Sequence, residues 1–452
     1  MGRDAGLDGH TAQAVFTVVD RVQPARVDAV RELLARVAAD PAGNELLPLG
    51  QVAGLHYASL VLHANDVERP LLVFEANVDG TIDGLLRRLV ERAGDGVGAL
   101  WSNCVGYPTA GADLDRRVAY LRDHVALPGA YHVGTTGLST GQIAAEATLH
   151  DAIAAFVDEQ RAAGALPVSS IEVRQAIVDH LVGRADLAWA LRPPTKEGMG
   201  TRLRRVLFLA RSSDRRIVLP TVVVLAVVLW GVWRWPIRTL LGIIVVLGLL
   251  AGSFRWRESR EAAEDRAVSD ALLDGVEEAE DRPAQVTNHL SSLVDVKPGR
   301  RILLRAVLFV IDVAARITYT KGQLGGIPSI HFAHWSVVDG GRRLLFVSNY
   351  DGSWESYLDD FIEKAASGLS AVWSNTVNFP RARWLGILPD SGGARYGPAF
   401  KRVARNSQSP TTIHYCAYPA LSVTNVLDNA RLRRGLIETM DEEQAWAWLS
   451  RL

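Results

Sequence analysis

The chain has 452 residues, which is enough for two or three domains with substantial cores. Its 49 lysines and arginines balance 50 aspartates and glutamates, and the net charge of -1 excludes a strongly basic surface, so we expect no nucleic-acid partner. Two cysteines, Cys104 and Cys416, lie far apart outside any CxxC pattern, which excludes a disulfide framework and a zinc finger.

The first predicted unit covers residues 12–140 and alternates short strands with helices. The expected elements are a strand at 14–22, a helix at 24–39, a hairpin of strands at 55–62 and 70–76, a helix at 81–93 and a strand at 130–135. This order is β-α-β-β-α-β, the ferredoxin-like split motif. Its sheet buries one face under the two helices and leaves the other face in need of a partner.

Residues 141–200 carry further helical patterns and end in a Pro-Pro breaker, which predicts a helical cap and linker. Residues 201–257 begin with a basic amphipathic segment and continue with two apolar runs, at about 217–235 and 237–254. Each run is close to the ~20 residues that cross the hydrocarbon core of a bilayer. Because a proline lies between the runs and ends a helix, we predict a two-helix transmembrane hairpin.

Basic residues set the expected orientation of this hairpin. Eleven of them flank the two apolar runs, against two in the short turn between the runs. Since translocated loops are poor in lysine and arginine, we expect both flanking regions in the cytoplasm, the chain in the inner (plasma) membrane, and membrane lipid as a partner. The N-terminal residues do not resemble a signal peptide, which agrees with this orientation. The alternative is a buried helical hairpin in a soluble core.

The second half of the chain repeats the first. Residues 258–283 are rich in charge and predict a solvated helical stalk, residues 284–437 form the second repeat, and a C-terminal helix follows at 438–452. A shift of 272 positions aligns residues 72–108 with 344–380, without a gap, at 15 identities in 37 positions. The predicted order is repeat, membrane hairpin, repeat, so that both copies lie on the same side of the bilayer.

The predicted fold class is therefore α+β. Two ferredoxin-like β-α-β-β-α-β repeats each have one open sheet face, and these faces can cover each other. We expect the repeats to pair as a dimeric α+β barrel within one chain, interrupted by the transmembrane hairpin.

An Asn-x-Asp-Gly element follows the third predicted strand in both copies and opens a helix. One interpretation is turn chemistry, in which Asn and Asp bind helix-start amides and Gly adopts a left-handed conformation. The other makes Asp79 and Asp351, together with Asn77 and Asn349, candidate catalytic residues, with the carboxylates between the sheets as acids or bases.

Histidines also recur in the two copies, as His56 with His331 and His132 with His414. A neutral imidazole binds a metal or a haem iron through one nitrogen, so these four histidines are candidate cofactor ligands. Core histidines with satisfied hydrogen bonds are the alternative. His331 and His334 are three apart on a strand and face opposite sides, so no metal site is predicted.

The doubled Leu-His-Tyr-Ala and Ile-His-Phe-Ala strands, Phe-x-x-Asn-x-Asp-Gly turns and Trp-Ser-Asn loops carry a resemblance. Over residues 15–138 and 286–436 the chain resembles uncharacterised bacterial membrane proteins, of actinobacterial type, with tandem dimeric α+β barrel repeats. In that superfamily, dye-decolorising peroxidases are tandem ferredoxin-like chains that bind haem and carry a Gly-x-x-Asp-Gly motif. This remote similarity implies haem as one cofactor, although the leading Gly is Ala76 or Ser348 in this chain.

Three classes of function are compatible with these patterns. The first is a membrane-anchored cytoplasmic module that binds or senses an apolar small molecule or lipid in a cavity between the sheets. The second is a haem-dependent or cofactor-free oxidoreductase of peroxidase type, and the third is a non-catalytic membrane scaffold. The sequence lacks a GxGxxG fingerprint, a P-loop, HExxH and GxSxG, which argues against nucleotide-dependent and common hydrolytic chemistry.

Overall fold

The computed structural model describes residues 10–108, 113–193, 230, 233–260, 267–280, 285–318, 324, 326–384 and 392–452. The first half of the chain forms β1 (Gln13–Arg21), α1 (Val27–Ala38), β2 (Leu55–His63), β3 (Leu71–Asp79), α2 (Ile82–Trp101), α3 (Leu114–Asp123), β4 (Val125–Ala126), β5 (Ala130–Val133), α4 (Thr140–Ala162) and α5 (Ser170–Val182). The second half forms α8 (Pro236–Ser259), α9 (Asp270–Glu280), β6 (Thr287–Asp295), α10 (Arg301–Thr318), β7 (Ile330–Val338), β8 (Arg343–Asp351), α11 (Trp354–Lys364), α12 (Ala366–Trp373), α13 (Gly397–Ser407), β9 (Ile413–Cys416), α14 (Val423–Gly435) and α15 (Glu442–Leu449).

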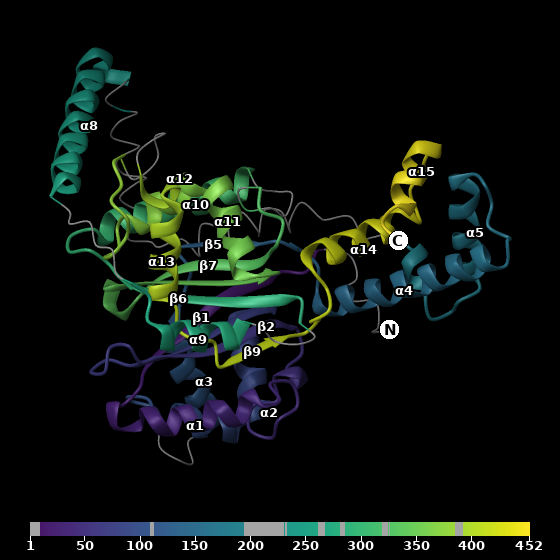
Figure 1. Ribbon diagram of the computed structural model, residues 1–452, viewed down its shortest axis with the longest axis horizontal. Coiled ribbons are helices and arrows are strands. Elements are labelled where there is room, and N and C mark those ends of the chain that lie inside the picture. The colour runs from purple at the N-terminus through teal and green to yellow at the C-terminus, as the bar shows by residue number, and fades with distance from the viewer. Residues whose placement is uncertain are drawn as a thin grey trace.

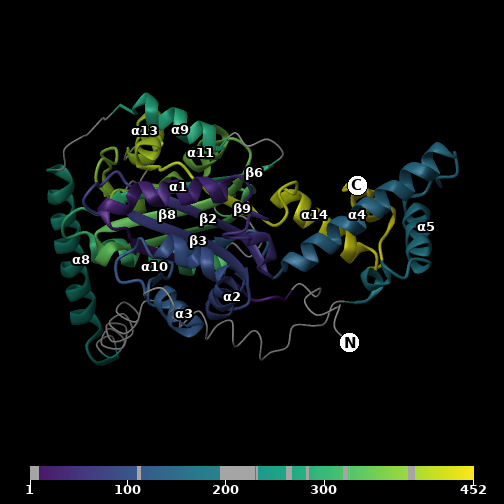
Figure 2. The same ribbon diagram turned by 90° about the horizontal axis from the view of Figure 1, so that it is seen from below.

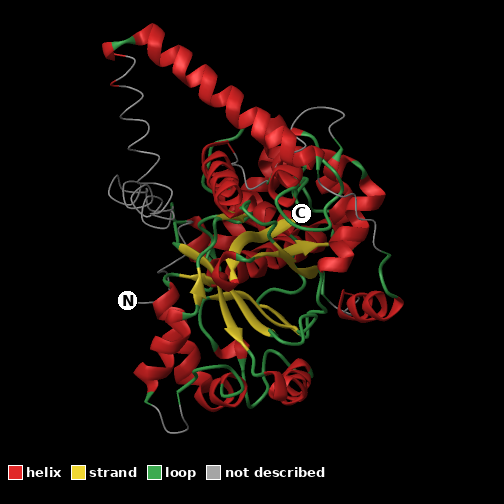
Figure 3. Ribbon diagram, turned by 90° about the vertical axis from the view of Figure 1, so that its left-hand side faces the viewer, coloured by secondary structure: helices red, strands yellow, loops and turns green. Residues whose placement is uncertain are grey.

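Two antiparallel sheets lie face to face between two layers of helices (Figure 1 and Figure 3). The first sheet has the strand order β4-β1-β3-β2-β9 and is covered by α1, α2 and α3. The second sheet has the order β5-β7-β8-β6 and is covered by α10, α11 and α12. The α+β class predicted from the sequence is confirmed.

The last strand of each repeat joins the sheet of the other repeat. β5 pairs with β7, and β9 pairs with β2. In the first sheet, the edge next to β1 is occupied by the two-residue strand β4. At the equivalent edge of the second sheet, next to β6, the described residues form an isolated bridge between Ser292 and Gln408. The expectation that a strand at 130–135 completes the sheet of its own repeat is therefore wrong.

Strand alternation separates an apolar environment from a polar one. In β3, the outward side chains of Phe74 and Ala76 belong to the large apolar core under the helices. The inward side chains change along the strand, from apolar Val73 to polar Glu75 and Asn77. Because alternate residues of a strand face opposite sides, the space between the sheets is apolar at one end and polar at the other.

The left-handed conformation predicted for the glycine of the Asn-x-Asp-Gly element is confirmed, and the residue after it caps the following helix. Gly80 and Gly352 have φ angles of 90° and 81°, a left-handed conformation that favours glycine. The hydroxyls of Thr81 and Ser353 then accept hydrogen bonds from the backbone N–H three residues on, at 3.1 and 3.3 Å. Each repeat therefore caps its second helix in the same way.

Helices α4, α5, α14 and α15 form a bundle beside the barrel (Figure 2). The shared apolar core of this bundle includes Leu149, Ile153, Ile177, Leu432 and Trp448. The cap predicted at 141–200 and the C-terminal helix predicted at 438–452 thus lie in one bundle, although they are far apart in sequence.

No helix in the described part of the chain combines the length and the apolar character that a membrane span requires. The predicted transmembrane hairpin is therefore wrong, and with it the predicted inner-membrane localisation with both repeats in the cytoplasm. The second apolar run, 237–254, belongs to α8, whereas residues 201–229, with the basic segment and most of the first run, lie outside the described residues. The last turns of α8 are charged and contact the second repeat: Glu258 accepts from the backbone N–H of Trp384 at 3.0 Å, and the Arg255 guanidinium lies over the Trp384 ring.

The charged segment 258–283 also differs from the predicted solvated stalk in its described part. Helix α9 buries Val276, and Glu280 forms an ion pair of 2.7 Å with Arg405 of α13. This helix therefore packs against the second repeat.

Candidate functional site

Two histidine–aspartate pairs occupy matching positions in the two repeats. His56 Nε2 lies 2.9 Å from Asp79 Oδ1, and His331 Nε2 lies 2.7 Å from Asp351 Oδ1. Both imidazoles are fully buried, and the Nδ1 atom of His56 also contacts the hydroxyl of Tyr418 at 2.9 Å. The structure thus joins each candidate aspartate to one candidate histidine of its own repeat.

The second oxygen of each aspartate binds the N-terminus of a helix. Asp79 Oδ2 accepts from the backbone N–H and the hydroxyl of Thr140, at 2.9 and 3.1 Å, at the start of α4. Asp351 Oδ2 accepts from the N–H of Val423 at 2.8 Å, at the start of α14. The helix dipole and charge-assisted hydrogen bonds favour a carboxylate there. The pairs therefore connect the barrel to the helical bundle, which accounts for their presence in both repeats.

The two candidate asparagines lie elsewhere, around the buried carboxyl of Glu75. The side-chain amides of Asn77 and Asn349 both donate to Glu75 Oε1, the latter at 3.1 Å. Asn349 Oδ1 in turn contacts His414 Nε2 at 3.0 Å, and His289 Nε2 lies 3.8 Å from Glu75 Oε2. Burial raises the pKa of Glu75 to about 7, against the smaller opposing effect of its hydrogen bonds.

The carboxyl of Glu75 and the imidazole of His289 meet only once between the sheets, because the symmetry-equivalent positions of the two repeats hold other residues. Glu75 is the fifth residue of β3, and the fifth residue of β8 is Val347. His289 is the third residue of β6, and the third residue of β1 is Val15. Because the equivalent positions are apolar, Glu75 and His289 have no counterparts in the other repeat.

The expected equivalence of His132 with His414 is wrong by one residue. His414 lies opposite Ser59 in the β2–β9 ladder, and the matching position of the β5–β7 ladder holds Tyr131 opposite His334. A one-residue shift moves a strand side chain to the other face. His132 is thus opposite Ala333 on the helix-covered face, where burial lowers its pKa to about 4.

The candidate histidines do not fit a haem or a metal. In the described residues, no three His, Cys, Asp or Glu side chains lie together as metal ligands. Both nitrogens of His56 are hydrogen-bonded, and His331 is bound to Asp351 with its ring 5.2 Å from the Tyr57 ring and 6.0 Å from the Tyr418 ring. These aromatic rings pack against the histidines, and no pocket among the described residues is lined by His56 or His331, so we derive no haem chemistry.

Sequence reasoning gave no role to a set of inward polar residues that link the two sheets. His63 contacts the hydroxyls of Ser291 and Ser409, at 3.0 and 2.8 Å, and His334 Nε2 contacts the Thr17 hydroxyl at 2.7 Å. Burial lowers the pKa of His63 and of His334 to about 3, so both are neutral near pH 7. Alternation was the available signal, because these polar residues recur at every second position of otherwise apolar strands.

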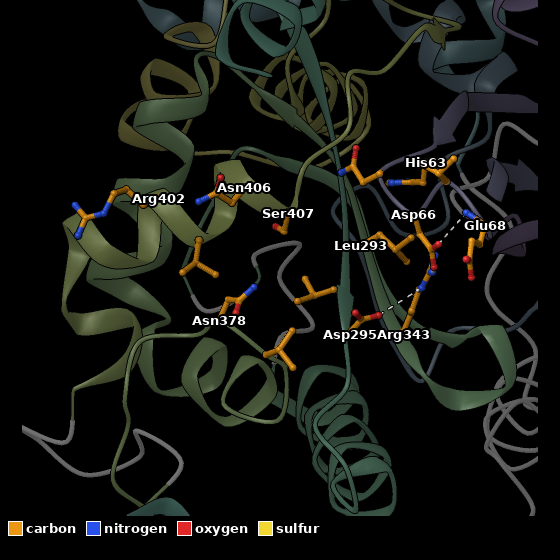
Figure 4. A pocket seen from close by; sticks show the side chains of 15 residues that line it. His63, Asp66, Glu68, Leu293, Asp295, Arg343, Asn378, Arg402, Asn406 and Ser407 are labelled. Carbon is orange, nitrogen blue, oxygen red and sulfur yellow. Dashed lines mark hydrogen bonds and ion pairs between the residues drawn. The ribbon is translucent and has the colours of Figure 1, made fainter. Parts of the chain in front are cut away.

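A cleft of about 550 Å³ opens at the edge of the barrel next to His63; we call it the edge cleft (Figure 4). One wall carries His63, Asp66 and Glu68 from the first repeat, and the opposite wall carries Asn378 and the α13 residues Arg402, Asn406 and Ser407 from the second. The apolar part of the lining is Val67, Leu293, Val294, Val377 and Val403. Both repeats thus build this cleft.

The charges of the edge cleft largely compensate each other. Arg343, which is 8% exposed, pairs with Asp66, with Asp295 at 3.5 Å and with Asp339 at 3.8 Å. A guanidinium that already faces three carboxylates is a weak site for a further anion. The lining also contains uncharged polar side chains, those of Asn65, Asn378, Asn406 and Ser407, together with neutral His63, whose two ring nitrogens already contact Ser291 and Ser409.

Comparisons of the chain with protein-family models, with curated proteins and with solved structures gave no match.

Proposed function

We propose that the protein is a binding module for a small polar molecule, which it holds in the edge cleft. The observation that carries this proposal is the cleft itself, a concave space of about 550 Å³ whose two walls come from different repeats. Ligand sites of proteins have volumes of about 300 to 1,000 Å³ and combine apolar walls with a few directed polar groups.

The lining defines the class of ligand. The lining is polar and uncharged around the amide of Asn378, which has both donor and acceptor atoms, and the apolar patch around Leu293 and Val403 covers a hydrocarbon part. Asp66, Glu68 and Asp295 outnumber Arg343 and Arg402, so a polyanion is disfavoured. An uncharged or zwitterionic metabolite with hydroxyl or amide groups fits this lining.

The test is a thermal-shift screen of the purified full chain against sugars, nucleosides, amino acids and short carboxylic acids. A ligand that binds only the folded state raises the melting temperature. We expect a raised melting temperature from members of the first three classes. Asn406→Trp fills the cleft from α13 and should abolish the shift.

The matched control is Gln175→Trp, which changes an exposed amide on a helix of the bundle, remote from the cleft. It should respond to the same compounds as the wild type. The proposal fails if no compound shifts the wild type, or if the hits shift both variants equally.

A further inference from the structure

A second cleft adjoins the edge cleft where the turn between β7 and β8 meets the start of α10; we call it the basic cleft. Its volume is about 640 Å³, and it shares one wall with the edge cleft. The basic side chains of its lining are Arg69, Lys297, Arg301, Arg342 and Arg343, and the acidic ones are Asp66, Asp295 and Asp339. Five basic against three acidic side chains leave an excess of two positive charges.

The acidic side chains of this lining are already paired. All three carboxylates contact the guanidinium of Arg343, and Asp339 also pairs with Arg21 at 3.3 Å. In contrast, neither Arg69 nor Arg342 forms an ion pair with a described residue. Because like charges repel each other, an anion between them is stabilised. The uncompensated charge of the basic cleft is therefore positive.

Backbone carbonyls hold two further cations at this cleft. Arg301 donates to Gly340 O at 3.0 Å, and its side chain lies across Gly341, where an added Cβ would come within 2.3 Å of Arg301 Cδ. Lys297 Nζ donates to Ser374 O at 3.0 Å. A guanidinium has five N–H donors, so the contact with one carbonyl holds Arg301 in place and leaves donors for a ligand.

The first repeat has the same backbone contact at this place without the basic side chains. In the second repeat, the N–H of Val296 donates to Arg342 O at 2.7 Å. In the first repeat, the N–H of Val22 donates to Pro70 O at 2.9 Å. The equivalents of Lys297, Arg301 and Arg342 are the uncharged Gln23, Val27 and Pro70. Since one copy folds without these charges, the fold does not account for them in the other.

We propose that the basic cleft binds a small molecule that carries a phosphate group. A phosphate monoester has a charge of about -1.5 to -2 at pH 7, which matches the excess of two positive charges. Its oxygens accept from the guanidinium groups of Arg69, Arg301 and Arg342, and its organic part lies against Pro298 and Ile302. The site is separate from the edge cleft and takes a ligand of different charge.

The test is isothermal titration calorimetry of the purified full chain with glycerol 3-phosphate, and with glycerol as the uncharged probe. It is done at low ionic strength, where exposed charges are little screened. We expect the wild type to bind glycerol 3-phosphate and not glycerol. The double variant Arg69→Gln/Arg342→Gln removes two charged donors and should bind glycerol 3-phosphate at least roughly tenfold more weakly. Its melting temperature should be unchanged, because neither side chain has an ion pair to lose.

The matched control is Arg36→Gln/Arg92→Gln, which removes two exposed arginines from α1 and α2, outside both clefts. It loses the same total charge and should bind glycerol 3-phosphate as the wild type does. Asn406→Trp, which fills the edge cleft, should also keep this binding.

Three results would overturn the proposal. The first is a wild type that does not bind glycerol 3-phosphate or binds glycerol equally well. The second is an equal loss of binding in the control pair and in the cleft pair, which would assign binding to the overall charge of the protein. The third is loss of binding in Asn406→Trp, which would place the phosphate in the edge cleft.

Discussion

At the residue scale, the buried carboxyl of Glu75 connects the stability of the barrel to pH. Its pKa is about 7 in the folded chain, against 4.5 as the ordinary value. The folded state therefore binds more protons than the unfolded state between these pH values, and stability falls as pH rises from about 4.5 through 7. The free-energy change from this one group is about 3 kcal/mol.

We predict that Glu75→Gln removes this dependence. Glutamine keeps an acceptor for Asn77 and Asn349 and cannot ionise. His63 and His334 oppose the effect of Glu75, because their lowered pKa values make stability rise with pH up to about 6.5. The measurement is thus the difference between variant and wild type in urea unfolding, at pH 5, 6, 7 and 8. The free energy of unfolding of the variant should rise relative to that of the wild type up to about pH 7, and the difference should then stay constant. A difference that is the same at all four pH values would contradict the prediction.

The aspartates of the two repeats give a second residue-scale prediction. Each uses both oxygens as acceptors, and an asparagine has only one. Asp79→Asn and Asp351→Asn should therefore each lower the free energy of unfolding by about 1 to 3 kcal/mol. Asp115→Asn, at an exposed ion pair with Arg87, is the control and should change it by less than about 0.5 kcal/mol. If the first two variants are as stable as the control, the two aspartates do not stabilise the connection between the barrel and the helical bundle.

At the element scale, the exchange of β5 and β9 means that each repeat stabilises the sheet of the other. The N–H of Ala417, just after β9, donates to His56 O at 2.9 Å, and alternation places the N–H of Tyr415 toward β2 as well. Tyr415→Pro removes that donor from a paired strand. We predict faster amide exchange in β2, in the first repeat, while β7 and β8 stay protected. Loss of protection in β7 instead would show that β9 belongs to the sheet of its own repeat.

Sequence periodicity predicted most individual elements and could not predict this exchange. The hairpin of β2 and β3 and the second helix of the repeat follow from local spacing, and both are confirmed. A short strand such as Ile413–Cys416 carries no information about which of two similar sheets it will join. The same limit explains the His132 error, because aligning single histidines across a loop ignores the strand register.

At the scale of the whole molecule, the sequence duplication correctly predicted two paired sheets. The apolar composition of residues 217–254 led to a wrong prediction of membrane topology. Apolar runs of span length were interpreted as a membrane hairpin, and no described helix meets that requirement. The candidate catalytic residues were found by their repetition, whereas the buried Glu75 and His289 are not repeated and were therefore not singled out. A search for residues shared by the two halves finds what both halves need to fold and overlooks side chains that occur in one half alone.

The helical bundle joins elements from both halves of the chain. Arg174 of α5 donates to the carbonyl oxygens of Gly435, Leu436 and Glu438, at 2.8, 3.1 and 2.6 Å, at the C-terminal end of α14. Together with the exchanged strands, these bonds join elements from both ends of the chain. We predict that near-ultraviolet and far-ultraviolet circular dichroism report a single coincident unfolding transition, although the chain is a duplication.

Arg174→Ala tests this coupling directly. Removing the guanidinium leaves the carbonyls at the end of α14 without their charged donor, at a cost of about 1 to 3 kcal/mol. Because barrel and bundle share α4 and α14, the midpoint should fall for both spectral probes together. Arg184→Ala is the control, since Arg184 pairs only at the surface, with Asp186, and should leave the midpoint nearly unchanged. A bundle that melted first in Arg174→Ala, with the barrel transition unmoved, would show that the bundle is an independent domain and that strand exchange alone couples the repeats.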